Sequence, residues 1–351
     1  MPVRSTLAHC LNSGGRPVEV SFGLTASPAL SNLHLIVGVG KIYKTHHTVV
    51  AAHGDSVLIE LIFLSDRSTV FCRPSYLVPY IRAVQNALRR RPPVRGGEPD
   101  LKPEYYSETS KDAVVEARLY ILRSSRCEWE LTDVLPVRIA NGQEMELYGL
   151  FHWQTDAVIP VGDRFLYWND LSNCHGIIIS DLMTENPELW YVRLPPDPLD
   201  VANMVSQNVC VTGHGSAVKF VRVSPRCCCG GPGATVRARS QHAFTITTWT
   251  LRTTDMTWEE NDLIDSDEVW AVAAPVVPRF RLQLPIVSFD KPDVICLLSR
   301  EPRLYRHDND TAWLVTVDTR RKNMTSVCRV KDKTQWNRAL LPSKVSSYFN
   351  P

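Results

Sequence analysis

The chain has 351 residues and is long enough to form one large β domain or two domains of ordinary size. Its 39 Lys and Arg residues nearly balance its 37 Asp and Glu residues, so the formal charge of +2 gives no global field that would attract nucleic acid or an anionic membrane. The first ten residues lack the apolar run of a secretory signal, and the longest apolar run, 57–64, is short and contains Glu60. We therefore expect a soluble protein of the cytoplasm or nucleus, without a membrane partner and with its ten cysteines reduced.

Short apolar runs followed by turn residues predict β-strands along most of the chain. Residues 57–64 and 69–72 flank a polar turn and predict a hairpin. In Val218–Val223, apolar and basic residues alternate, as in an antiparallel strand with one wet face. Further strands are expected at 165–168, 176–181, 189–194, 293–298 and 313–318.

A stretch of about a dozen residues occurs twice. Residues 120–130 return as residues 249–259 at a constant offset of 129, so that Trp129 in the first copy corresponds to Trp258 in the second. Each copy has the pattern of a strand, a polar turn and a second strand. We expect residues 119–127 and 244–252 to occupy equivalent positions in two repeated β units.

Many short antiparallel strands in a chain with an internal repeat predict an all-β fold, a β-propeller-like arrangement of short antiparallel blades. Paired β-sandwiches are the alternative. In either case large aromatic side chains should pack between the sheets. These expected packing residues are Trp129, Trp190, Trp249, Trp258 and Trp313.

The strand pattern extends from residue 18 to residue 330 and predicts a single domain there, between tails at 1–17 and 331–351. One helix is expected, over 80–91, because Pro92 and Pro93 end its apolar periodicity. Two segments, 89–104 and 224–241, contain too few apolar residues to order themselves and are expected to be loops.

Several motifs resemble a plant family, much expanded in grasses, known as domain of unknown function 1618. They are Trp168-Asn169-Asp170, the strand Gly176–Asp181, the segment Tyr191–Pro196 with Pro198, and, later, Trp249-Thr250-Leu251, Asp265–Trp270, Pro285–Ser288 and Trp313–Arg320. The resemblance spans 18–330 and is strongest over 156–330. It implies a propeller-like domain of the kind attached to F-box proteins, and it implies no activity, cofactor or catalytic residue. The N-terminal segment lacks an F-box-like helical run.

Four segments resemble motifs of chemical sites, but each lacks part of the motif. Gly38–Lys41 lacks the spacing of a phosphate-binding loop, and Gly213–Ser216 lacks the G-x-S-x-G of a nucleophile elbow. The adjacent Cys227–Cys229 lack the spacing of a zinc site and suggest exposed thiols, whose pKa Arg226 would lower. The acidic run 259–268 contains no Gly for a calcium loop and is expected to be a solvated loop.

These patterns favour a non-enzymatic protein-binding or scaffold module with an unknown protein partner, and no catalytic, cofactor or metal residue is predicted. One alternative is an enzyme that uses a central propeller pocket, for which Asp170, Asp181 and Asp318 are the strand-end acids to inspect. Another is nucleic-acid binding through the loop Arg89–Arg95, with affinity that falls steeply as salt rises.

Overall fold

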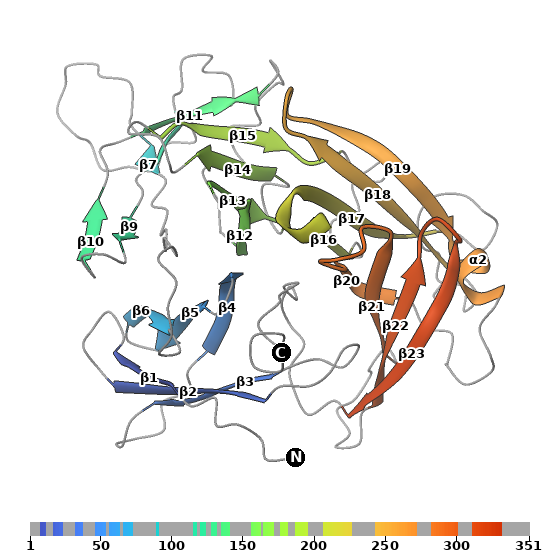
Figure 1. The fold of residues 1–351 in the computed structure, drawn as a ribbon, viewed down its shortest axis with the longest axis horizontal. Helices are drawn as coiled ribbons and strands as arrows, with labels where there is room; N and C mark the ends of the chain where they lie inside the picture. The colour runs from blue at the N-terminus through green and yellow to red at the C-terminus, as the bar shows by residue number, and fades with distance from the viewer. Residues whose placement is uncertain are drawn as a thin grey trace, which may run out of the picture. The chain divides into compact units, whose positions relative to one another are not determined.

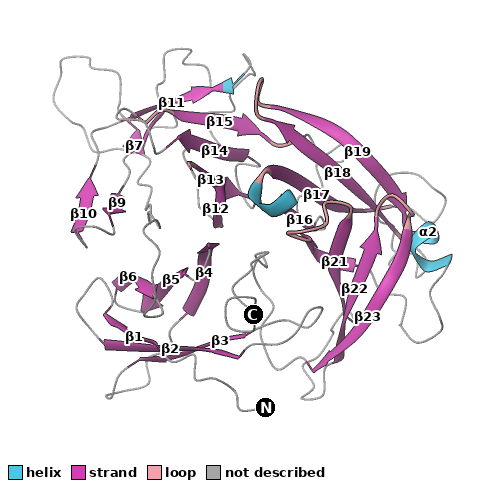
Figure 2. Cartoon of the chain, in the orientation of Figure 1, coloured by secondary structure: helices cyan, strands magenta, loops and turns pink. Residues whose placement is uncertain are grey.

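The computed structural model describes part of the chain in full and further strands by their backbone alone. The fully described residues are 136–140, 156–162, 164–171, 176–181, 187–195, 206–226, 243–271, 282–299 and 312–329. Strands make up most of this part, and its α-helix, α2 (Ser266–Ala271), is short (Figures 1 and 2). The prediction of an all-β fold is confirmed.

The chain divides into two compact units. One contains Met1–Val78, Ile159–Asp163 and Pro195–Pro351, and the other contains Pro79–Val158 and Arg164–Leu194.

The N-terminal part of the first unit contains two three-stranded antiparallel sheets. β1 (Ala8–Leu11), β2 (Pro17–Gly23) and β3 (Asn32–Val37) form one, and β4 (His46–His53), β5 (Ser56–Phe63) and β6 (Asp66–Cys72) form the other. The pairing of Val57 with Cys72 confirms the hairpin predicted around residue 65. β1 lies inside the segment predicted to be an N-terminal tail.

A seven-stranded mixed sheet has the order β12-β13-β14-β15-β11-β8-β7. Its strands are β7 (Arg89–Arg90), β8 (Val115–Ala117), β11 (Leu135–Ile139), β12 (Ala157–Val161), β13 (Phe165–Asp170), β14 (Gly176–Asp181) and β15 (Leu189–Arg193). Arg89 and Arg90 pair antiparallel with Glu116 and Val115. The predictions of a helix over 80–91 and of a loop from residue 89 are therefore wrong at these two positions, where backbone pairing fixes an extended conformation. The rest of that helix lies outside the described residues.

Two four-stranded antiparallel sheets follow, each with its strands side by side in chain order. The first contains β16 (Ser206–Thr212), β17 (Ala217–Pro225), β18 (Phe244–Arg252) and β19 (Thr257–Asp265). The second contains β20 (Leu282–Val287), β21 (Val294–Arg300), β22 (Thr311–Asp318) and β23 (Asn323–Lys331). A four-stranded antiparallel sheet of this kind is the unit from which propellers are built.

The repeated segment forms a hairpin in both copies, each in a different sheet. β9 (Tyr120–Arg123) pairs with β10 (Glu128–Leu131) so that Leu122 faces Trp129. In the second copy, Leu251 of β18 faces Trp258 of β19. The two registers coincide at the offset of 129 residues seen in the sequence, which confirms that the repeat encodes the same hairpin twice.

The core between the two four-stranded sheets contains side chains from both sheets and from α2. Its buried members are Cys210, Val221, Val223, Phe244, Ile246, Ile264, Val269, Trp270, Leu282, Val287, Ile295, Leu297, Val315 and Val317. Of the tryptophans predicted to pack between sheets, Trp249 is buried, whereas Trp190, Trp258 and Trp313 are half-buried. The side chain of Trp129 lies outside the described residues.

A line of side-chain hydrogen bonds joins β16 to β20. Asn208 Nδ2 donates to Pro285 O (3.0 Å), Thr212 Oγ1 donates to Ser288 O (2.6 Å), and Ser206 Oγ accepts from the N–H of Leu284 (2.7 Å). These residues stand at alternate positions and so share one face of β16. The backbone of β20 is irregular here, with a bulge after Gln283 and a φ of 51° at Leu284. Side chains of β16 therefore satisfy backbone groups of the neighbouring sheet.

Candidate functional site

The turns at one end of the two four-stranded sheets are bonded to each other. The N–H of His214, in the turn between β16 and β17, donates to Phe289 O in the turn between β20 and β21 (3.1 Å). The N–H of Thr319, after β22, donates to Asp293 O (2.8 Å). These hydrogen bonds fix three turns relative to one another.

The His214 turn has an unusual backbone. Gly213, His214 and Gly215 all have positive φ values, of 58°, 58° and 99°. Glycine adopts this region freely, whereas His214 incurs a cost of about 1 kcal/mol. The exposed imidazole lies with Nδ1 3.3 Å from Asp290 Oδ1 and contacts the edge of the Phe289 ring. Local contacts thus hold an exposed histidine in one orientation.

A buried lysine lies behind these turns. The side chain of Lys219, on β17, is 8% exposed, and its Nζ lies 3.8 Å from Asp293 Oδ1. Burial lowers the pKa of Lys219 below its ordinary value; Asp293 and Asp262 oppose this shift, and Arg320 adds to it. A desolvated amine of this kind loses its proton more readily than a surface lysine and can act as a nucleophile or a base.

The two aspartates beside Lys219 have further partners. Asp262 Oδ2, on β19, accepts from the hydroxyls of Thr319 (2.9 Å) and Thr248 (3.4 Å). Asp293 Oδ2 lies 2.8 Å from Nε of Arg320, whose side chain is 76% exposed. We call Lys219, Asp262, Asp293, Thr319 and Arg320 the Lys219 cluster. Its members come from separate strands and turns, which explains why no sequence motif marks it.

The pKa of Lys219 gives a pH-dependent prediction. Because the folded-state pKa lies below the unfolded value, the unfolded chain binds more protons between the two values, and the free energy of unfolding rises with pH through that window. Urea unfolding from pH 8 to 11 should therefore show the wild type gaining stability relative to Lys219→Met as pH rises. A constant difference between the two proteins across this range would contradict the shift.

Two of the three acids proposed for a central pocket, Asp170 and Asp181, belong to the same unit but do not lie near each other. The register of β13 and β14 places Asp170 opposite Gly176 and Asp181 opposite Phe165. These are opposite ends of one hairpin, about 17 Å apart at about 3.4 Å per residue. Asp170 is buried, and Asp181 is hydrogen-bonded to Arg164. The two carboxylates are too far apart to share a proton or a metal ion.

Asp318, in the other unit, has a local role. Its Oδ1 accepts from the N–H of Arg321 (2.9 Å) and closes the turn between β22 and β23. Its other oxygen lies 3.9 Å from Nη1 of Arg321. This is the usual capping contact of an aspartate at the start of a turn.

The acidic run 259–268, predicted to be a solvated loop, is instead the strand β19 and the start of α2. Asp265 caps the helix, because its Oδ1 accepts from the N–H of Asp267 (2.7 Å) while Glu268 Oε2 accepts from the N–H of Asp265 (2.9 Å). This reciprocal pair is a capping box. The prediction of a loop was wrong because residues 257–265 pair with β18 and because Asp265 and Glu268 satisfy backbone N–H groups at the helix terminus; Glu259 and Glu260 are exposed to solvent, as predicted.

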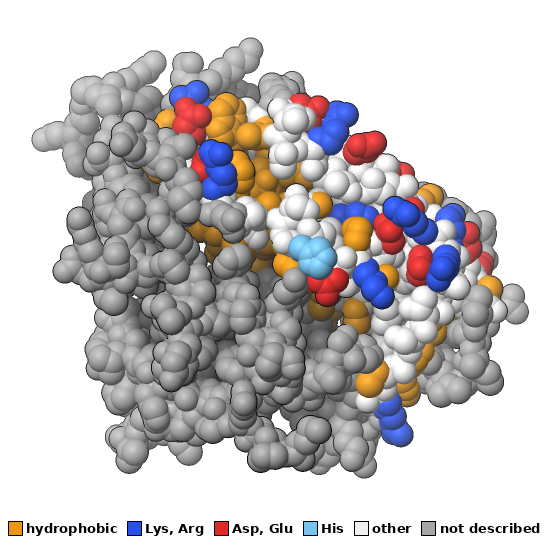
Figure 3. All heavy atoms as spheres, viewed as in Figure 1, with side chains coloured by type: hydrophobic (Ala, Val, Ile, Leu, Met, Phe, Trp, Pro, Cys, Tyr) orange, Lys and Arg blue, Asp and Glu red, His pale blue; other side chains and the backbone are white. Residues whose placement is uncertain are grey.

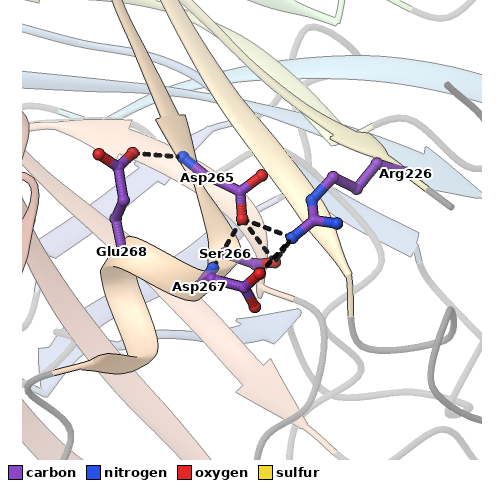
Figure 4. A network of polar contacts seen from close by, with 5 residues as sticks. All are labelled: Arg226, Asp265, Ser266, Asp267 and Glu268. Atoms are coloured by element: carbon purple, nitrogen blue, oxygen red, sulfur yellow. Dashed lines mark hydrogen bonds and ion pairs between the residues drawn. The ribbon is translucent and has the colours of Figure 1, made fainter. Parts of the chain in front are cut away.

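Arg226 is the cation of this network (Figure 4). Its side chain is 11% exposed, and Nη2 lies 2.5 Å from Asp265 Oδ1 and 2.9 Å from Asp267 Oδ2. The predicted loop 224–241 is therefore wrong at its start, because residues 224–225 end β17 and Arg226 is anchored by ion pairs. Cys227–Cys229, and hence the predicted effect of Arg226 on them, lie outside the described residues.

The described cysteines Cys210, Cys296 and Cys328 are free thiols. Burial raises the pKa of Cys210 to about 12, although the N–H of Val287 donates to its sulfur (3.4 Å). Burial also raises the pKa of Cys296 to about 11. In the residues the structure describes, no three His, Cys, Asp or Glu side chains gather as metal ligands. No helix among them is long and apolar enough to cross a membrane.

We expect Cys210 and Cys296 to resist alkylation by iodoacetamide at pH 8, because the thiolate is the reacting species and is scarce at this pH. Peptide mass spectrometry should find both thiols unmodified in the folded protein and modified in 8 M urea. Rapid labelling of Cys210 in the folded protein would show that β16 and β20 separate readily.

Comparison with known proteins gives two results besides the family. No curated protein matches the chain. A solved structure, the WD40 domain of SCAP from fission yeast, is 11% identical and aligns with 95% of this chain and 78% of its own, with a TM-score of 0.29. Such a distant likeness carries no argument here.

The family resemblance has a firmer basis. The matched segment contains the predicted motifs Trp168-Asn169-Asp170 and Gly176–Asp181, and it extends through β19 and α2 into β21. The origin of the chain in a plant stays a prediction. Residues 168–296 match the model of the family described as "Protein of unknown function (DUF1618)", which confirms the predicted resemblance for this part of the chain.

Proposed function

We propose that the chain is a non-enzymatic protein-binding module. The observation that carries the proposal is the burial of both faces of strands β16–β18 in the sheet β16–β19. On one face, Val209, Phe220 and Trp249 form a cross-strand row with exposed fractions of 0%, 0% and 9%. On the other, the row that contains Val221 is equally buried. When both faces of a sheet are covered, its turns and its outermost strands are the parts that can contact another molecule.

The turns are suited to this role because they are held in place. The contacts of His214 with Phe289 and of Thr319 with Asp293 restrain three turns that carry exposed charged side chains. Arg320 and Arg321 are 76% and 78% exposed. Rigid presentation of surface groups lowers the entropic cost of binding.

Affinity capture tests the proposal. The tagged full chain is used as bait in a lysate of its native source, with and without nuclease treatment, and an unrelated β-rich protein is the control bait. We expect at least one protein to be retained in near-stoichiometric amount by this chain alone. Absence of any such protein in repeated captures would overturn the proposal, and loss of all bound material on nuclease treatment would favour the predicted nucleic-acid alternative through Arg89–Arg95.

The Lys219 cluster favours an enzyme as the second candidate. A buried amine with a lowered pKa between two carboxylates is typical of functional sites, although structural ion pairs shift pKa values too. This candidate predicts turnover, in a panel of ester, amide and glycoside substrates, that Lys219→Met abolishes and that the unrelated Cys328→Ser retains. A folded wild-type protein without turnover on the panel would count against it.

A further inference from the structure

β19 is the outermost strand of its sheet. The sheet order is β16-β17-β18-β19, so one side of β19 pairs with β18, and the other side has no partner strand among the described residues (Figure 1). Free strand edges present backbone donors and acceptors to other chains, and proteins commonly place charges on them to prevent unwanted pairing. β19 has nine residues, enough for a stretch of added strand.

The exposed side chains of β19 are of two kinds. Glu259, Glu260 and Asn261 are exposed and polar, and Leu263 is apolar with 54% of its surface exposed. On the face drawn in Figure 3, acidic and basic side chains lie near one another. Leu263 and Val327 are the large apolar side chains that stand out as exposed within the described residues. An exposed apolar side chain does not repel other chains, so repulsion alone does not explain why Leu263 is on this strand.

Glu259 and Glu260 differ from the other acids whose side chains the structure describes. Those acids each have a cation or a hydrogen-bond donor; for example, Arg252 pairs with Asp255 at 2.7 Å and Lys322 with Glu268 at 3.3 Å. Within the described part of the chain, Glu259 and Glu260 have neither. Adjacent strand residues point to opposite faces, so the two unpaired charges flank both sides of the free edge.

The other outermost strand provides a contrast. The middle of β23 exposes Thr325, Ser326 and Val327, none of which is charged. A partner with positive charge therefore has an electrostatic reason to choose β19 over β23.

We propose that β19 docks a basic, extended segment of a partner protein, which adds as a further strand with its Lys or Arg side chains beside Glu259 and Glu260. The backbone of the segment bonds to the free edge of β19, and an apolar residue of the segment covers Leu263. This inference rests on the proposed protein-binding function and adds the surface and the chemical class of the partner.

Fluorescence anisotropy with the full chain tests the proposal. The probe is a labelled, end-blocked peptide, Thr-Val-Lys-Lys-Thr-Val-Thr, whose adjacent Lys residues point to opposite faces of an added strand. It is compared with a version that has Glu in place of Lys and with one N-methylated at alternate residues. We expect the Lys peptide to bind and both other peptides to bind at least tenfold more weakly. Equal binding of the N-methylated peptide would overturn strand addition, because that peptide keeps the charges but loses backbone donors.

Variants locate the binding surface. Glu259→Gln with Glu260→Gln should weaken binding of the Lys peptide at least tenfold. Glu188→Gln with Asp290→Asn removes the same number of exposed charges from positions outside this sheet and should leave binding unchanged. If the two double variants bind alike, the proposal for β19 is wrong. If a captured partner still binds the Glu259→Gln, Glu260→Gln protein with unchanged affinity, β19 is excluded while the protein-binding function stands.

Discussion

Replacing Phe220 with Ala is expected to lower the free energy of unfolding by about 3–5 kcal/mol, because the change removes a large buried ring and leaves a cavity. Phe220 has no exposed surface, and its ring centroid lies 5.2 Å from that of Trp249 and 5.9 Å from that of Trp258. Arg222 lies over the Phe220 ring at 5.0 Å and loses this contact too. Urea unfolding monitored by circular dichroism gives the value.

Trp258→Ala is the matched comparison. The repeat alone predicts a buried Trp258 and a loss as large as that for Phe220, but Trp258 is half-buried because β19 is the outermost strand. We expect a loss less than half that of Phe220→Ala, in proportion to the smaller apolar area removed from water on folding. Equal losses would show that Trp258 is covered in solution.

Gly176→Ala is expected to cost about 3 kcal/mol, because the new methyl group would overlap a buried ring. A Cβ at residue 176 would lie 2.6 Å from both Cζ and the hydroxyl oxygen of Tyr191, whose side chain is 7% exposed. Tyr191 of β15 pairs with Ile178 of β14, two residues from Gly176, and its ring reaches the space that a Cβ at residue 176 would occupy. Thermal unfolding of the full chain measures the effect.

Two controls separate overlap from backbone effects. Gly162→Ala places a Cβ in open space at a φ of 56° and should cost only about 1 kcal/mol of backbone strain. Tyr191→Ala combined with Gly176→Ala should cost much less than the sum of the single changes, because the overlap is already gone. Additive losses would contradict the proposed contact.

Local patterns were sufficient to predict many of the strands and the repeat, but not β1, β7 or most of β19. The alternation in 218–223 predicted the strand β17, although the wet face that it implied is buried, with Lys219 and Arg222 6% and 3% exposed as whole residues. The shared offset of the two Trp-containing segments predicted two hairpins of one register. Both signals depend on neighbours in sequence. The fold class followed from them because short antiparallel strands have few ways to bury their faces.

The Lys219 cluster and the Arg226 network could not be predicted in this way. Lys219 and Asp293 are far apart in sequence, and only the packing of two sheets brings them together. The segment 265–268 does carry the signature of a capping box, a polar residue followed three positions later by Glu, and this signal could have identified the start of α2. Its high charge suggested a solvated loop instead.

Hydrogen–deuterium exchange of the full chain, with and without a partner captured from its native source, tests the central claim most directly. Strand addition protects backbone amides of the receiving strand, so the account predicts slowed exchange at residues 257–265 on binding and little change in β23. The same experiment on the Glu259→Gln, Glu260→Gln protein should show reduced protection at these residues. Protection confined to another surface, or none at β19 with the partner fully bound, would contradict the account.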